Sequence, residues 1–182
     1  MTVANILTII RIILIPFFLL AMIYGHYVFG VIVFVTAGVT DGLDGFVARF
    51  YHQKTSIGAI LDPMADKLML TTVYVVLALP NIGLPYSIPM WVPVLTISRD
   101  VIIVLFALLL NLFLDVSRFP PSWAGKCTTF FQIVYAAAAL IKNAFGFPGM
   151  VAGALMWAVA VFTVFSGLHY LWRIRTMTQG VQ

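Results

Sequence analysis

Four aspartates lie close together in the sequence, and carboxylates spaced in this way can bind metal ions. The chain has six acidic residues, all of them Asp, and four of these fall between positions 41 and 66. Asp41 and Asp44 are three residues apart, so they share one face of a helix. Asp62 and Asp66 are four residues apart and share one face of the next helix. The two pairs can therefore face each other.

These four carboxylates need counter-ions. Close carboxylates repel one another in a low dielectric unless divalent cations lie between them, and ligand sets made only of oxygen favour hard ions. We therefore predict a two-metal site for Mg²⁺ or Mn²⁺, with ligands Asp41, Asp44, Asp62 and Asp66.

Small residues lie on the same helix faces as the carboxylates: Gly45, Ala48 and Gly58. Small side chains leave space, so a flat or phosphorylated ligand can approach the backbone there. The alternative is close packing between helices, for which Gly38 and Gly42 form a GxxxG pair. Both interpretations stay open.

The amino-acid composition indicates what kind of helices position these residues. Apolar residues make up 63% of the 182-residue chain and charged residues 9%, and the mean hydropathy is +1.09. A soluble globular protein is excluded, because such domains have about 25% charged residues. Apolar runs approach the roughly 20 residues that cross a bilayer as a helix. We predict an all-α membrane protein with a single domain over 1–182 and six transmembrane helices, at about 5–24, 27–50, 57–80, 88–112, 122–142 and 149–172.

The first apolar run, Asn5 to Tyr24, is predicted to be a transmembrane helix and not a targeting signal. A secretory signal has a basic segment ahead of its apolar part and a cleavage site after it. Here Arg11 lies within the run, and no basic segment precedes it.

Basic residues predict the orientation of the helices, because short cytoplasmic loops carry an excess of Lys and Arg. One side holds Lys142, and the other holds Arg49, Lys54, Arg118, Lys126, Arg173 and Arg175. Both termini are then cytoplasmic, and the aspartates lie on the same side. We expect an integral membrane protein whose active site faces the cytoplasm. Arg49 can bind a phosphate there, or can simply extend its charged end to the membrane surface.

The aspartate segment resembles the signature of the CDP-alcohol phosphatidyltransferase family. The chain reads Asp44-Gly45, two residues, Ala48-Arg49, eight residues, Gly58, three residues, Asp62, three residues and Asp66. Every fixed position of that signature is matched, and Asp41 supplies the family's preceding Asp. The six predicted helices extend the resemblance over nearly the whole chain.

The resemblance implies an enzyme that transfers a phosphatidyl group from CDP-diacylglycerol to an alcohol and releases CMP. Metal ions held by the four aspartates would grip the diphosphate, and Asp66 would take a proton from the acceptor hydroxyl. The resemblance also implies a homodimer. The residues that it implies for binding CDP-diacylglycerol are Asp41, Asp44, Gly45, Ala48, Arg49, Gly58 and Asp62.

The acceptor alcohol has two candidates. Segments 5–11 and 121–132 resemble the bacterial phosphatidylglycerophosphate synthases of this family, whose acceptor is glycerol 3-phosphate. A phosphorylated acceptor needs cations, and the candidates are Arg99, Arg118 and Lys126. The alternatives are an ion pair between Arg99 and Asp100, and ordinary loop charge for the other two.

Residues 98–101 instead resemble the mitochondrial-type cardiolipin synthases of the family, whose acceptor is phosphatidylglycerol. The stretch from Val101 to Leu110 carries no charge, whereas the glycerol 3-phosphate enzymes usually have a further Arg there. We expect phosphatidylglycerophosphate synthesis, with cardiolipin synthesis as the alternative.

An ion transporter is a remote alternative, because it also places Asp residues inside the membrane. Transport sites usually lie near the midplane on broken helices, often within repeated halves. The aspartates here lie at predicted helix ends, and the sequence has no visible repeat. The expected partners are CDP-diacylglycerol, the alcohol acceptor and membrane lipids, and no nucleic acid.

Overall fold

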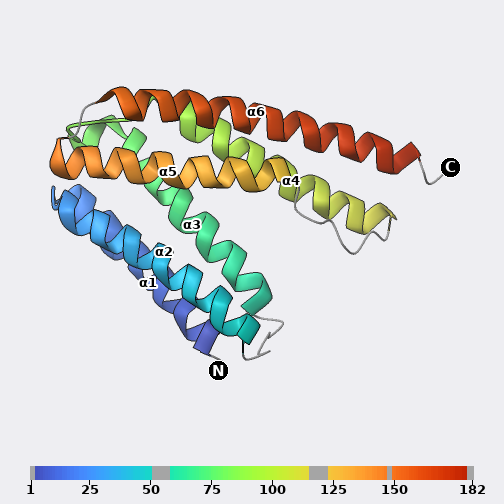
Figure 1. The fold of residues 1–182 in the computed structure, drawn as a ribbon, viewed down its shortest axis with the longest axis horizontal. Helices are drawn as coiled ribbons and strands as arrows, with labels where there is room; N and C mark the ends of the chain where they lie inside the picture. The colour runs from blue at the N-terminus through green and yellow to red at the C-terminus, as the bar shows by residue number, and fades with distance from the viewer. Residues whose placement is uncertain (1–2, 51–57, 115–122, 147–148, 180–182) are drawn as a thin grey trace. The chain divides into compact units, whose positions relative to one another are not determined.

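The fold is entirely helical in the part of the chain that the structure describes. The computed structural model describes the backbone of residues 3–50, 58–114, 123–146 and 149–179. In these ranges it has six α-helices and one short 3₁₀ helix (Figure 1). Their bounds are Val3–Ile23 (α1), Tyr27–Phe50 (α2), Gly58–Ala78 (α3), Pro80–Ile82 (η1), Trp91–Leu114 (α4), Trp123–Phe145 (α5) and Gly149–Gln179 (α6). Each α-helix overlaps one predicted span, so the all-α fold is confirmed.

Several helices have the length and composition of membrane spans. Among the described residues, three stretches meet both criteria: Ile6–Ile23, Trp123–Phe145 and Met150–Tyr170. The first part of α2, Tyr27–Gly42, is a shorter apolar helix. Large apolar side chains such as Ile13 and Phe17 are half exposed. Exposure of this kind on many helices fits a surface that lipid covers, and it supports an integral membrane protein.

The chain divides into two compact units, and each is described by itself. The first comprises residues 1–88 and 136–148, and the second comprises residues 89–135 and 149–182. The α5 helix contributes its C-terminal part to the first unit and its N-terminal part to the second.

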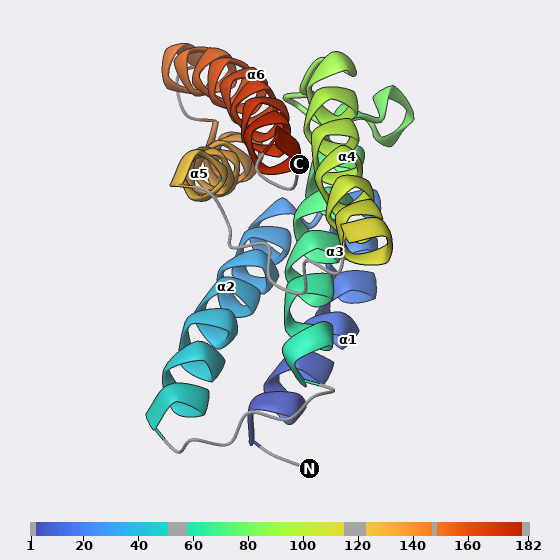
Figure 2. The same cartoon turned by 90° about the vertical axis from the view of Figure 1, so that its right-hand side faces the viewer.

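In the first unit, α1 packs against both α2 and α3, and two views show the three helices side by side (Figures 1 and 2). A Schellman motif ends α1 and reverses the chain. In it, His26 N donates to Ala21 O at 2.8 Å, and Gly25 N donates to the Met22 carbonyl at 3.3 Å. Gly25 has a φ of 77°, which favours glycine. This turn lays α2 along α1.

Gly30 allows this close approach of α1 and α2. A Cβ at position 30 would lie 2.7 Å from Sδ of Met22, which is fully buried. Gly38 and Gly42 differ, because a Cβ at either position would meet no described atom within 4 Å. Nothing in the described part of the chain packs against this GxxxG pair, and the packing interpretation of Gly45, Ala48 and Gly58 stays a prediction.

A side chain of α5 fixes the loop between α3 and α4. Tyr86 N donates to Oδ1 of Asn143 at 2.9 Å, and Nδ2 of Asn143 donates back to Tyr86 O at 2.9 Å. Nζ of Lys142 lies 3.7 Å from the centre of the Tyr86 ring. Asn143 is buried, and its side-chain amide pairs with the backbone N–H and C=O groups of Tyr86, which lie in a loop and not in a helix.

In the second unit, α4 packs against α6. The Thr128 hydroxyl of α5 donates to Phe162 O of α6 at 2.9 Å. The rings of Phe131 and Phe162 stack with their centres 4.4 Å apart. These contacts join α5 to α6 within this unit by both a hydrogen bond and ring packing.

Candidate functional site

Arg11 is the most unusual residue of the first unit, because it is a charged side chain in the core. It lies on α1 within an apolar sequence, and its side chain is only 2% exposed. A buried guanidinium is costly unless carboxylates neutralise it. The partners of Arg11 therefore mark a site.

The carboxylates of Asp41 and Asp66 converge on Arg11. Nη1 of Arg11 lies 3.0 Å from Oδ1 of Asp41 on α2. The same nitrogen donates a hydrogen bond to Oδ1 of Asp66 on α3. Because α1 packs against both of these helices, one guanidinium reaches carboxylates from two different elements. The structure thus brings together the first and the last of the four predicted ligands.

The site has a closed side and an open side. The Arg11 side chain is almost completely buried, whereas the side chains of Asp41 and Asp66 are 46% and 44% exposed. The two carboxylates therefore remain accessible to a ligand while Arg11 neutralises them from inside.

The other motif residues lie in the same two helices. Asp44, Gly45, Ala48 and Arg49 belong to the last turns of α2, and Gly58 and Asp62 belong to the first turns of α3. Their side chains lie outside the described residues. The helix bounds show only that the first four residues share α2 with Asp41 and that the other two share α3 with Asp66.

The described residues fit a divalent cation in their chemistry. Asp41 and Asp66 supply oxygen atoms, which hard cations prefer, and both oxygens already share one positively charged partner. Within the described side chains, no group of three or more His, Cys, Asp or Glu residues forms a complete ligand set. Asp44 and Asp62, whose side chains are not described, would have to complete it.

Arg99, a predicted acceptor residue, lies in the second unit and is held by neighbours. Its Nη1 donates to Oδ1 of Asp100 at 2.7 Å, and its Nη2 donates to Oγ of Ser166 at 2.5 Å. Its Cζ also lies 5.9 Å from the centre of the Tyr170 ring. The ion pair with Asp100 was one of the two interpretations of Arg99, and the structure contains that pair.

The other two predicted acceptor residues are Lys126 and Arg118. Lys126 lies in the first turn of α5 and is exposed. Arg118 lies outside the described residues.

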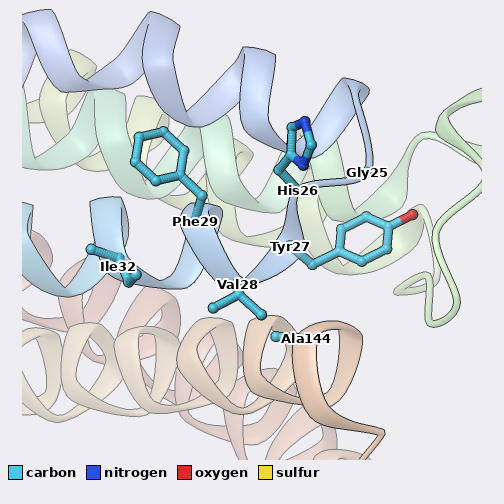
Figure 3. A pocket seen from close by; sticks show the side chains of 7 residues that line it. All are labelled: Gly25, His26, Tyr27, Val28, Phe29, Ile32 and Ala144. Atoms are coloured by element: carbon cyan, nitrogen blue, oxygen red, sulfur yellow. The ribbon is translucent and has the colours of Figure 1, made fainter.

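A separate cavity lies at the opposite end of α2 from Asp41. It has a volume of about 490 Å³ and is lined by Gly25, His26, Tyr27, Val28, Phe29, Ile32 and Ala144 (Figure 3). The distance along α2 from Tyr27 to Asp41 is roughly 21 Å at the usual helical rise. Its lining is mostly apolar and contains no carboxylate. The cavity therefore lacks the chemistry of the aspartate site.

Arg11 is the residue whose role the sequence analysis missed. Its signal was present, because a single Arg inside an apolar run must find a partner in the folded protein. The sequence does not say which of the six aspartates would be that partner.

Comparison with known proteins identifies the family. The sequence profile described as CDP-alcohol phosphatidyltransferase matches residues 1–165. The chain belongs to the CDP-alcohol phosphatidyltransferase family. The resemblance seen in the aspartate motif is thereby confirmed, and so is the prediction of an enzyme of phospholipid biosynthesis. Enzymes of this family generally use divalent metal ions, and their substrates are CDP-diacylglycerol and an alcohol acceptor.

Relatives within the family carry two kinds of name. A "Probable phosphatidylglycerophosphate synthase" of Mycobacterium tuberculosis is 35% identical, over 98% of this chain and 84% of that protein. A "CDP-diacylglycerol--glycerol-3-phosphate 3-phosphatidyltransferase" of Haemophilus influenzae is 34% identical, over 91% of this chain and 89% of that protein. A "Cardiolipin synthase (CMP-forming)" of Homo sapiens is 29% identical, over 93% of this chain and 61% of that protein.

Proposed function

We propose that this CDP-alcohol phosphatidyltransferase transfers a phosphatidyl group from CDP-diacylglycerol to glycerol 3-phosphate and releases CMP. The observation that carries the proposal is the convergence of Asp41 and Asp66, from two helices, on one cationic group. The choice of acceptor is supported by the two bacterial relatives whose names specify phosphatidylglycerophosphate or glycerol 3-phosphate.

In the proposed reaction, the acceptor hydroxyl oxygen attacks the β-phosphorus of CDP-diacylglycerol, the one that carries the diacylglycerol. A new P–O bond forms to the acceptor, and the bond from this phosphorus to the bridging oxygen breaks. CMP leaves with the bridging oxygen. Asp66 accepts the hydroxyl proton, because its exposed carboxylate is open to a ligand on one side and is held by Arg11 on the other.

Asp41, Asp44, Asp62 and Asp66 would hold divalent ions, Mg²⁺ or Mn²⁺, in a two-metal site. Such ions supply positive charge that stabilises the negative charge on the diphosphate and on the transferring phosphoryl group. Gly45, Ala48 and Gly58 would leave room for the cytidine and the diphosphate. Arg49 would bind a phosphate oxygen.

The acceptor site is proposed to contain Arg99, Arg118 and Lys126, which would neutralise the phosphate of glycerol 3-phosphate.

One observation favours phosphatidylglycerol, and hence cardiolipin synthesis, as a second candidate function. Arg99 is already paired with Asp100 and Ser166, so it has less free charge for a phosphorylated acceptor. The human relative also supports this second candidate.

The membrane arrangement is part of the proposal. We infer six transmembrane helices in a single domain, with both termini and the aspartate site on the cytoplasmic side, and a homodimer as the assembly. Support for the orientation comes from the excess of basic residues near the loops of one side.

The test is CMP release by the purified chain with CDP-diacylglycerol and either Mg²⁺ or Mn²⁺, comparing the two acceptors. Release that depends on glycerol 3-phosphate is the expected result. Release only with phosphatidylglycerol would replace the first function by the second. No metal-dependent CMP release with either acceptor, from protein that remains folded, would contradict both.

A further inference from the structure

We propose that Arg11 is a positioning residue that acts as an internal counter-cation, supplying positive charge to Asp41 and Asp66 when no divalent ion is bound. The inference rests on the proposed function, in which these two aspartates bind a divalent ion. In addition, the Arg11 guanidinium would replace part of the positive charge of that ion when the ion is absent.

The geometry of the three side chains supports this role. One nitrogen, Nη1, contacts Oδ1 of Asp41 at 3.0 Å and donates to Oδ1 of Asp66. The aspartates come from α2 and α3, so their mutual repulsion would push those helices apart. Arg11 is on α1, which packs against both helices, and its charge therefore holds the two carboxylates in one place.

Burial shows that Arg11 acts from the inside of the site. Its side chain is 2% exposed, whereas nearly half of each aspartate side chain is exposed. A divalent ion can therefore reach the carboxylates from the open side without removal of the arginine. Both positive charges would then act on the same pair of carboxylates.

Two cations that neutralise the same carboxylates weaken each other's binding. Arg11 reduces the repulsion between the Asp41 and Asp66 carboxylates, so a divalent ion has less repulsion left to relieve. The positive charge of Arg11 also repels that ion. Arg11→Gln removes this charge and leaves a polar side chain of smaller size in the core. The variant should be less stable without metal and should gain more from metal, because linkage between two sites acts in both directions.

The experiment measures thermal unfolding of the full chain in detergent micelles, using tryptophan fluorescence. Each protein is purified in millimolar Mg²⁺, transferred to EDTA, and titrated with Mg²⁺. Compared with the unaltered chain, Arg11→Gln is expected to have a lower Tm in EDTA and a larger rise in Tm with Mg²⁺. Its half-saturating Mg²⁺ concentration is expected to be about fivefold lower, at the low end of typical couplings between sites.

Two further variants separate charge from packing. Arg11→Lys keeps the charge and is expected to show the Mg²⁺ response of the unaltered chain. Asn143→Ala removes another buried polar side chain of the first unit, one that bonds to Tyr86 and contacts neither aspartate in the described hydrogen bonds. It should lower the Tm equally in EDTA and in Mg²⁺.

The outcomes distinguish this inference from the function on which it rests. If Mg²⁺ raises the Tm of the unaltered chain and raises the Tm of Arg11→Gln by no more, the proposed role of Arg11 is wrong, whereas the metal site is still supported. An Arg11→Gln protein that does not fold at any Mg²⁺ concentration would also overturn the role, because Mg²⁺ should replace the missing charge. If the unaltered chain neither responds to Mg²⁺ nor releases CMP, the proposed function itself fails.

Discussion

Nη2 of Arg99 donates a hydrogen bond to Oγ of Ser166 at 2.5 Å, and this bond joins α4 to α6. Ser166 is fully buried, and the Arg99 side chain is 10% exposed. The same guanidinium pairs with Asp100. Arg99 therefore has a structural role in the second unit, in addition to the acceptor-binding role proposed for it.

Substitution of Arg99 separates these two roles. Arg99→Met leaves Asp100 without its guanidinium partner, so the Tm should fall by about 6–20 °C. If Arg99 also binds the acceptor phosphate, the KM for glycerol 3-phosphate should rise at least about tenfold, since a charge-assisted hydrogen bond contributes about 1.5–3 kcal/mol. The KM for CDP-diacylglycerol should not change.

Ser166→Ala is the matched control, because it removes the same hydrogen bond and keeps the charge of Arg99. It should lower the Tm by less than Arg99→Met and leave the KM for glycerol 3-phosphate within about threefold of its normal value. Equal KM changes in the two variants would mean that Arg99 acts only through its structural contacts.

Asp66→Asn tests the proposed general base. The amide cannot accept the hydroxyl proton, so turnover should fall by about 10²–10⁴-fold, the usual contribution of general base catalysis. Some binding of CDP-diacylglycerol should remain, because three other aspartates of the motif are intact. CMP release and equilibrium binding of the nucleotide lipid measure the two effects separately. Full turnover in folded Asp66→Asn protein would exclude the base assignment.

Asp41→Asn should behave differently from Asp66→Asn. Asp41 is proposed only as a metal ligand, whereas Asp66 is proposed as a base that binds the metal only partially. Loss of Asp41 should therefore weaken the metal-dependent binding of CDP-diacylglycerol as well as turnover. Binding measured over a series of Mg²⁺ concentrations gives the comparison. Binding that is unchanged at every Mg²⁺ concentration would remove Asp41 from the ligand set.

Gly30→Ala tests the close approach of α1 and α2. The added methyl group would lie 2.7 Å from Sδ of the buried Met22, so the Met22 side chain or the helix backbone must shift. Overpacking of this kind typically costs about 1–3 kcal/mol, and the Tm should fall. Gly38→Ala on the same helix is the control, because its methyl group meets no described atom within 4 Å. A Tm that falls as much in Gly38→Ala as in Gly30→Ala would contradict this explanation.

The amino-acid sequence by itself predicted the helices and the family. Apolar runs interrupted by turn residues gave six helices at the expected places, because a chain with 9% charged residues must pair its backbone groups internally in lipid. The aspartate segment matches the signature of the family, and the family model over residues 1–165 confirms this resemblance. Helical periodicity adds that residues three and four apart lie on one face. These properties are local, so short segments of sequence contain them.

Only the tertiary structure decided which charged groups meet. Arg11 and Asp66 are 55 positions apart, and their contact depends on how α1 packs against α3. The sequence contains six aspartates that could pair with Arg11, and in the described side chains Arg11 pairs with Asp41 and Asp66. Likewise, Ser166 became a partner of Arg99 only through the packing of α6 against α4. Such pairings depend on side-chain geometry across helices, which no local spacing rule specifies.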